Sequence, residues 1–194
     1  YHAVGMDRRE SARLLDRKEK FRSNFTDPVF DALRLLEFIR EDPHFKFTKI
    51  GIYGISAGAG EAKFVAALDG QIDAVVLACG VTSHNQLFQN RAWIPSLSGM
   101  IIYPELGLGE PAIGHLSSQE FQEALERATP EHHTRAREIF REQFPFFEDL
   151  DPERVVPLIA PTPLLLISGA DDGQFTPEGV REVDYVGRVE TDSE

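Results

Sequence analysis

The sequence is poor in residues that crosslink a chain or anchor it in a membrane. Cys79 is its one cysteine among 194 residues, which excludes an internal disulfide. No apolar run approaches the roughly 20 residues that a bilayer-spanning helix needs, so no membrane contact is expected. No histidine and cysteine spacing of a metal site, no phosphate-binding loop and no dinucleotide fingerprint is present. We therefore expect neither a metal nor a cofactor.

Basic residues are also in short supply. Lysine and arginine number 20 against 32 aspartates and glutamates, which gives a formal net charge of −12. Such a surface repels phosphate backbones, so a nucleic-acid partner is not expected. The 42% of hydrophobic residues, 14 phenylalanines included, suit a single domain with a substantial core. The sequence does not define an oligomeric state. A cytoplasmic location is favoured, and the start at Tyr1 rather than methionine leaves secretion open.

The most informative segment is Gly51–Gly60, GIYGISAGAG, which sets Ser56 between two glycines. The apolar, β-branched residues of 47–53 before it predict a strand, and the helical spacing of 61–68 after it predicts a helix. A serine in this context is typical of the G-x-S-x-G nucleophile elbow. The alternative is a glycine-rich turn whose serine only caps the helix.

The elbow interpretation explains the residue types. A serine at the tip of so tight a turn requires strained backbone, and we expect Gly54 and Gly58 to be glycines because a Cβ at either position would clash. A helix that begins directly after Ser56 directs the Ala57 N–H towards the place where an oxyanion forms. Ser56 is thus the predicted nucleophile, and Ala57 is a predicted oxyanion donor.

Helix and strand signals alternate along the rest of the chain. A cap at 24–27 followed by Pro28 predicts a helix that ends near 41–43, and Pro177 opens a helix near the other end. Continuous apolar runs at 73–79 and 163–169 predict buried strands, with Cys79 as a small buried core residue. This alternation indicates a mostly parallel sheet covered by helices on both faces.

Residues 84–151 interrupt the alternation, and we interpret them as a helical, cap-like insertion above the sheet. A capping box at 117–120 and the Thr129-Pro130-Glu131 start predict helices there, the second running towards Phe144. The apolar segment 93–103 lines a substrate pocket in one interpretation and packs against the sheet in the other.

A serine nucleophile needs a base, and the base needs an orienting acid. In this architecture the acid stands on the loop after a late strand. Asp171 and Asp172 directly follow the predicted strand 163–169. One of these aspartates is interpreted as the acid; the alternative, which we favour less, is that both only form an Asp-Asp-Gly turn.

Together, GISAGAGEAKFVAALDGQIDAVVLACG and LIAPTPLLLISGADD resemble the α/β-hydrolase superfamily, in particular its dienelactone-hydrolase-like and acetylxylan-esterase-like branch. The opening residues 1–8 are also similar to a segment of such enzymes, so the resemblance covers most of the chain outside the insertion. It implies Ser56 as nucleophile and the Ala57 N–H as oxyanion donor. The family's Gly-x-x-Asp spacing implies Asp172 as the acid, with Asp171 second.

Two departures from the family pattern stand out. Dienelactone hydrolases proper use a cysteine nucleophile, whereas Ser56 implies carboxylesterase or deacetylase chemistry. The family's histidine follows the acid, yet residues 173–194 contain none. The upstream histidines are expected on loops and on a polar helix. His84 follows the predicted strand 73–79 near the sheet edge, where it either reaches a substrate or is an ordinary loop histidine, and the second is favoured. From this missing base and the missing early strands we expect part of a longer hydrolase, incomplete at both ends, with little turnover of its own.

The expected function is a serine ester hydrolase that forms an acyl-serine intermediate on a small-molecule ester. A serine peptidase of the prolyl-oligopeptidase type and a non-catalytic pseudo-hydrolase are the alternatives. The sequence does not identify the substrate.

Overall fold

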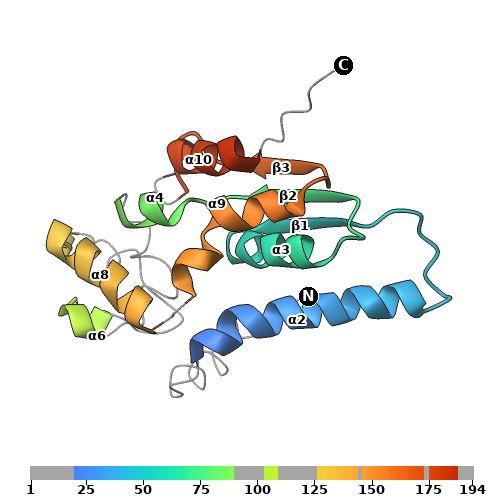
Figure 1. Cartoon of the computed structure of the whole chain (residues 1–194), viewed down its shortest axis with the longest axis horizontal. Coiled ribbons are helices and arrows are strands. Elements are labelled where there is room, and N and C mark those ends of the chain that lie inside the picture. The colour runs from blue at the N-terminus through green and yellow to red at the C-terminus, as the bar shows by residue number, and fades with distance from the viewer. Residues whose placement is uncertain (1–19, 90–102, 109–125, 144–145, 173–174, 188–194) are drawn as a thin grey trace.

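Three parallel strands lie at the centre of the protein, in the order β1-β2-β3 (Figure 1). The computed structural model describes residues 20–89, 103–108, 126–143, 146–172 and 175–187. The strands are β1 (Gly51–Ile55), β2 (Ala74–Ala78) and β3 (Leu164–Ile167). Ile55 pairs with Ala78, and Ala78 pairs with Ile167, so the three strands end together at one carboxyl edge.

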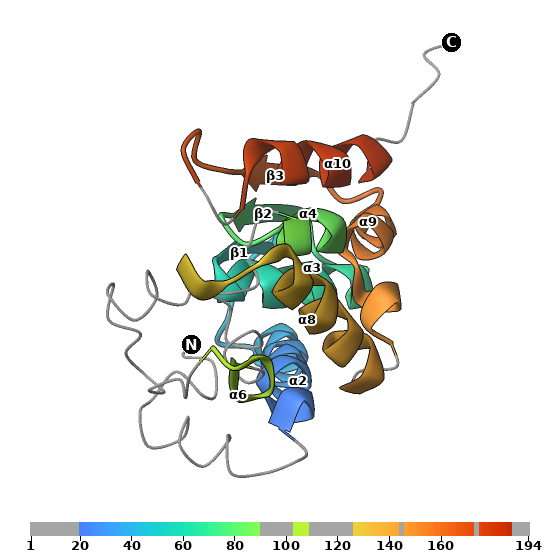
Figure 2. The ribbon, with the colours of Figure 1, turned by 90° about the vertical axis from the view of Figure 1, so that its left-hand side faces the viewer.

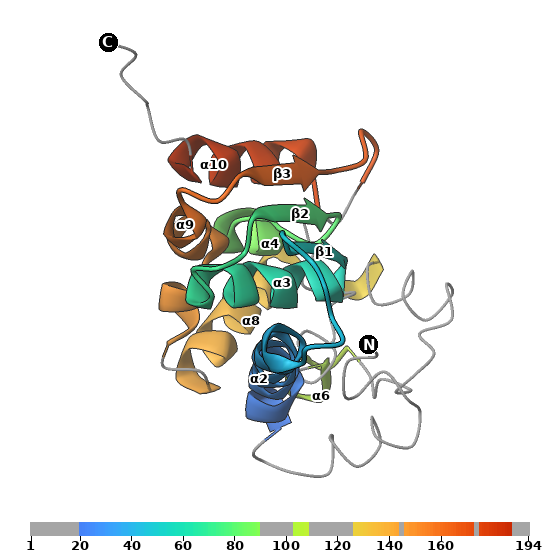
Figure 3. The same cartoon turned by 90° about the vertical axis from the view of Figure 1, so that its right-hand side faces the viewer.

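Helices cover one face of this sheet. The helix α3 (Ala57–Leu68) packs on β1 and β2, and α2 (Lys20–Glu41) packs on α3 as an outer layer. Beside α3 lie α9 (Pro152–Val155) and η2 (Val156–Ile159), and α10 (Pro177–Gly187) packs on these two helices. Figures 2 and 3 show these helices on the same side of the strands. Alternate strand residues point into this layer and form its core: Val75, Leu77, Leu164 and Leu166.

The opposite face of the sheet is exposed in the described part of the chain. Tyr53 and Ile55 of β1, and Leu165 and Ile167 of β3, are 43–62% exposed. The α/β class and the parallel sheet are thus confirmed. Helices were expected on both faces of the sheet. The described residues cover only one face, although the side chains of the strands are apolar on both.

The residues of the expected insertion form a smaller helical group beside the sheet. It contains α4 (His84–Gln89), α6 (Tyr103–Leu106), α8 (Pro130–Gln143) and η1 (Phe147–Leu150). The rings of Phe88, Phe140 and Phe147 meet at centroid distances of 5.3–5.9 Å and join α4, α8 and η1. The helix predicted after Thr129 is confirmed. The expectations for residues 1–8, 93–102 and 117–120 lie outside the described residues.

Two local predictions were wrong. The first helix begins at Lys20, so Pro28 lies inside it rather than in its first turn. Pro28 is fully buried, and burial of its apolar ring offsets the loss of a backbone donor. Cys79 was predicted as a buried strand residue, but it lies one residue past β2, is half-buried and has a φ of 48°. No described helix combines the length and apolarity that a bilayer crossing requires.

A bidentate ion pair fastens the outer helix to the inner one. The two terminal nitrogens of Arg40 in α2 donate to the two carboxylate oxygens of Asp69, at 2.7 and 3.0 Å. Burial acts to raise the pKa of Asp69, but the hydrogen bonds from Arg40 and from the Gln71 N–H, with the Arg40 charge, outweigh it and lower that pKa. The Asp69 side chain is only 8% exposed, so the pair is shielded from solvent.

Arg40→Met is expected to lower the free energy of unfolding by about 1–3 kcal/mol at neutral pH. Because the pKa of Asp69 is lower in the folded than in the unfolded state, the stabilisation is fully present above the unfolded carboxyl pKa of about 3.9. It is lost as the pH falls through the lower, folded value. Urea unfolding of both proteins at several pH values measures this difference.

The control is Arg34→Met, which removes an exposed pair with Glu37 on the same helix. It should change stability by no more than about 0.5 kcal/mol. An Arg40→Met effect that stayed constant from neutral pH to pH values below the carboxyl range would contradict the role of Asp69.

Candidate active site

Ser56 stands at the junction of β1 and α3, at the carboxyl edge of the sheet. Its φ of 53° and ψ of −122° lie outside the regions that residues with a side chain normally adopt. The Ser56 N–H donates to the Ala78 carbonyl at 2.9 Å, and its carbonyl accepts from the N–H groups of Ala59 and Gly60. The turn is therefore held on both sides by backbone bonds.

The Ser56 side chain makes no capping hydrogen bond to α3, and the residue is exposed. The interpretation of Ser56 as a simple helix cap is therefore wrong. A strained backbone that holds an exposed serine at the start of a helix is the geometry of a nucleophile elbow.

Glycines make this strained turn possible, but they are not the two that were predicted. A Cβ on Gly54 would lie 2.2 Å from the Gly58 carbonyl oxygen, so the expectation for Gly54 is confirmed. A Cβ on Gly58 would meet nothing within 4 Å, so the predicted clash there was wrong. Gly58 sits in the first turn of α3 with its Cβ direction facing open space.

The second indispensable glycine is Gly80, which sequence reasoning missed. A Cβ on Gly80 would lie 2.1 Å from the Ser56 carbonyl oxygen and 2.6 Å from the Ala59 Cβ. The loop after β2 therefore packs its backbone directly against the elbow. The sequence does show a glycine directly after the strand at 73–79. That this glycine lies against Ser56 follows only from the pairing of β1 with β2, which the sequence does not reveal.

Ala57 begins α3 and lies beside Ser56. In the part of the chain that the structure describes, no hydrogen bond occupies the Ala57 N–H. The amide also lies at the positive end of the helix dipole. Its position suits a donor to a developing oxyanion.

Asp172 follows β3 by five residues and lies at the same edge of the sheet as Ser56, two strands away. Its Oδ1 accepts from the Phe175 N–H at 2.9 Å, and its own N–H donates to the Gly169 carbonyl at 3.2 Å. Asp172 is half-buried, whereas Asp171 is exposed. The loop therefore fixes the Asp172 carboxylate more firmly than that of Asp171.

The structure describes four histidines: His44, His84, His132 and His133. His44 is exposed and pairs with Asp42, and His132 accepts from the Thr129 N–H at the start of α8. Within the described residues, no histidine hydrogen-bonds to Ser56. His84 was expected on a loop, but it begins α4 and is buried.

His84 belongs to a second polar cluster, which we call the neck cluster: Lys63, His84 and Asp151. The His84 N–H donates to Asp151 Oδ2 at 3.1 Å, and the His84 ring stacks on Phe147 at 4.1 Å. Lys63 lies seven residues after Ser56, so its Cα is about 10 Å further along α3. Across the described residues, none of the hydrogen bonds, ion pairs and ring contacts of the neck cluster involves Ser56.

Burial perturbs every titratable group of the neck cluster. It lowers the pKa of His84 to about 3, with the Lys63 and Arg137 charges acting in the same direction. It also lowers the pKa of Lys63 to about 8, against the attraction of Asp151. Burial raises the pKa of Asp151, although its carboxylate accepts hydrogen bonds from the backbone N–H groups of Glu153 and His84, which act to lower that pKa. The imidazole is thus uncharged at neutral pH.

The strained serine between a parallel strand and a helix, with an acidic loop two strands away, defines an α/β-hydrolase-type protein. Residues 34–183 match the family model described as BAAT / Acyl-CoA thioester hydrolase C terminal, and the chain belongs to this family. Comparisons with curated proteins and with solved structures found no match. The family's description names an acyl-CoA thioester hydrolase, so a hydrolase-related family is shown and the resemblance to α/β-hydrolases is confirmed at the level of the superfamily.

Proposed function

We propose that this protein is a serine hydrolase of carboxylic esters and thioesters, with Ser56 as its nucleophile. The observation that carries the proposal is the φ of 53° at an exposed serine whose side chain does not cap its helix. Such backbone strain costs on the order of 1–3 kcal/mol, and strained residues of this kind cluster at active sites and ligand-binding sites.

In the proposed reaction the Ser56 hydroxyl loses its proton to a base while its oxygen attacks the acyl carbonyl. The Ala57 N–H stabilises the oxyanion, the alcohol or thiol leaves with a proton, and water then hydrolyses the acyl-serine. Asp172 has the role of holding an imidazole base in the correct tautomer. Because no described imidazole hydrogen-bonds to Ser56, we expect slow turnover by the 194-residue chain.

Two lines of support bear on the substrate. The family is named for acyl-CoA thioester hydrolysis, which favours an acyl thioester. The resemblance to the dienelactone-hydrolase-like and acetylxylan-esterase-like branch favours a small oxygen ester. Both classes of substrate present an acyl carbonyl carbon to Ser56, so the proposal covers the two classes and predicts an acyl-Ser56 intermediate from each.

The test measures hydrolysis of p-nitrophenyl acetate and of butyryl-CoA by the 194-residue chain, with and without added imidazole. After subtraction of the rate that imidazole gives without protein, imidazole is expected to accelerate both reactions by supplying the base, and Ser56→Ala is expected to abolish this protein-dependent acceleration. Mass spectrometry should find the acyl group on the peptide that contains Ser56.

Cys79→Ala is the matched control, because Cys79 is a second nucleophile directly after the neighbouring strand. It should retain the imidazole-stimulated rate. Acylation that persists in Ser56→Ala, or butyryl-CoA binding without any acylation of Ser56, would overturn the proposal, the second in favour of a pseudo-hydrolase.

A further inference from the structure

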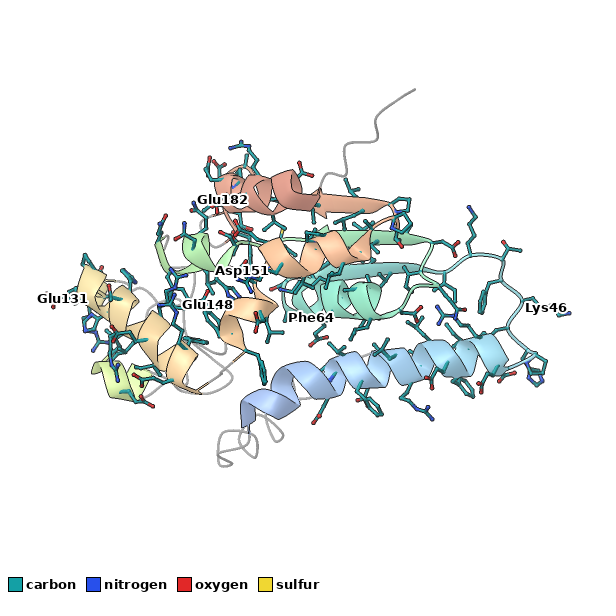
Figure 4. The ribbon with its side chains drawn as sticks, in the orientation of Figure 1. Lys46, Phe64, Glu131, Glu148, Asp151 and Glu182 are labelled. Carbon is teal, nitrogen blue, oxygen red and sulfur yellow. The ribbon has the colours of Figure 1, made fainter. Side chains whose placement is uncertain are left out.

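Three potential metal ligands meet where residues 84–151 leave the sheet and return to it. His84 is the first residue of α4, Glu148 lies in η1, and Asp151 caps α9. One ligand atom from each residue lies within 4.8 Å of the other two. Figure 4 shows Glu148 and Asp151 in the region between α8 and α9. Residues 67 positions apart are thereby brought into contact.

The His84 ring offers a buried ligand atom without a partner. Its Nδ1 is shielded from solvent and makes no hydrogen bond, and the residue is 9% exposed. Nδ1 lies 3.6 Å from Asp151 Oδ2, which is too long for a hydrogen bond. Two ligands at 2.0–2.1 Å from a tetrahedral zinc ion lie about 3.3 Å apart, so a small shift would let one ion join them.

The surroundings hold these ligands in place. The imidazole stacks on Phe147 with an interplanar angle of 6°. The Asp151 carboxylate is fixed by two backbone donors, the His84 N–H and the Glu153 N–H. Preorganised ligands of this kind lose little conformational freedom when an ion binds.

Positive side chains adjoin the three ligands and set a limit on affinity. Glu148 pairs with Arg141 and lies 3.6 Å from Arg137, and Lys63 acts electrostatically on both Asp151 and His84. These cations balance the two carboxylates when no ion is bound. A divalent ion must therefore compete with Lys63 and Arg137 for the same carboxylates.

We propose that His84, Glu148 and Asp151 form a site for a first-row divalent cation of the Zn²⁺ type, which links the two ends of the 84–151 segment. One imidazole nitrogen and two carboxylate oxygens suit Zn²⁺ better than Mg²⁺ or Ca²⁺, which prefer oxygen ligands alone. The three ligands come from α4, η1 and the cap of α9, where the chain of the 84–151 segment leaves the sheet and returns to it, so we assign the ion a role in holding the fold together.

Isothermal titration of the 194-residue chain with ZnCl₂ tests this site. We expect one equivalent to bind, and Co²⁺ in its place should give the visible absorption of a tetrahedral site. Zn²⁺ should raise the melting temperature, and Mg²⁺ should not. His84→Phe, which can keep the stack on Phe147, should weaken Zn²⁺ binding at least about tenfold. Lys63→Met should strengthen binding, because it removes a competing cation.

Glu148→Gln serves as a second ligand variant at a half-exposed position, where the fold is little affected, and it should also weaken binding at least about tenfold. The control is His44→Gln, which removes an exposed histidine paired with Asp42. His44→Gln should leave the stoichiometry and affinity of Zn²⁺ binding unchanged. Binding that survives both His84→Phe and Glu148→Gln, or that disappears in His44→Gln, would overturn the proposal.

Discussion

Gly54→Ala and Gly80→Ala are each expected to destabilise the protein by about 3 kcal/mol or more, whereas Gly58→Ala should change its stability by no more than about 1 kcal/mol. The three glycines surround the same serine. A new Cβ would lie 2.2 Å from a backbone oxygen at Gly54 and 2.1 Å from one at Gly80, but would meet nothing within 4 Å at Gly58.

The difference arises from what each methyl group would displace. At Gly54 and Gly80 the obstacle is backbone, which cannot move without breaking the contact between β1, the elbow and the loop after β2. At Gly58 the methyl group enters open space on a helix, where alanine is the better helix former by about 1 kcal/mol. Gly58→Ala is therefore expected to be neutral or slightly stabilising.

Chemical denaturation of the three variants gives the stabilities, and a fluorophosphonate probe, read with and without imidazole, reports on Ser56. Gly58→Ala should unfold and react like the parent chain, since its elbow is unchanged. Gly80→Ala should lose stability and Ser56 labelling together. If Gly80→Ala were as stable as Gly58→Ala, the close approach of the loop to Ser56 would be refuted.

These three glycines separate the features that local sequence predicts from those that depend on tertiary contacts. The strand, the serine and the helix follow from local periodicity, and α3 begins directly after Ser56 as predicted. Whether a glycine is required depends on its distance from other backbone segments. Gly58 matched the motif yet faces open space, whereas Gly80 lies outside the motif and touches it across the sheet.

The two faces of the sheet illustrate a similar limit. The continuous apolar runs of β2 and β3 predict burial on both sides, since the pattern has no polar alternation. The helix-facing residues Leu164 and Leu166 pack against the core, while Leu165 and Ile167 on the other face are exposed. Periodicity predicts that a strand belongs in a parallel sheet, but it does not say which described elements cover each face.

The neck cluster was beyond prediction for a different reason. Lys63 was recognised only as part of a helix, His84 as a loop residue near the strand ends, and Asp151 only as the end of an expected insertion. The distance in sequence between His84 and Asp151 hides their contact. Lys63 in a mostly apolar helix was the one local signal, because a lysine that such a helix buries needs a partner for its charge.

Asp151→Ala is expected to lower the free energy of unfolding by about 3–5 kcal/mol. The substitution removes the cap of α9 and leaves the His84 N–H without its acceptor. It also leaves the buried Lys63 ammonium without the carboxylate that attracts it. The last effect should dominate, because an uncompensated buried charge costs more than a lost cap, which is worth about 1 kcal/mol.

A double-mutant cycle separates these contributions. If the unpaired Lys63 charge dominates, Asp151→Ala combined with Lys63→Met should be at least about 1 kcal/mol more stable than Asp151→Ala alone. Urea unfolding in the presence of a chelator keeps any bound cation out of the measurement. Asp149→Ala is the matched control, since Asp149 forms an exposed pair with Arg154 and should cost no more than about 0.5 kcal/mol. Strict additivity of Asp151→Ala and Lys63→Met would mean that the lysine and the aspartate do not stabilise each other, and that the cost at Asp151 comes from its backbone hydrogen bonds alone.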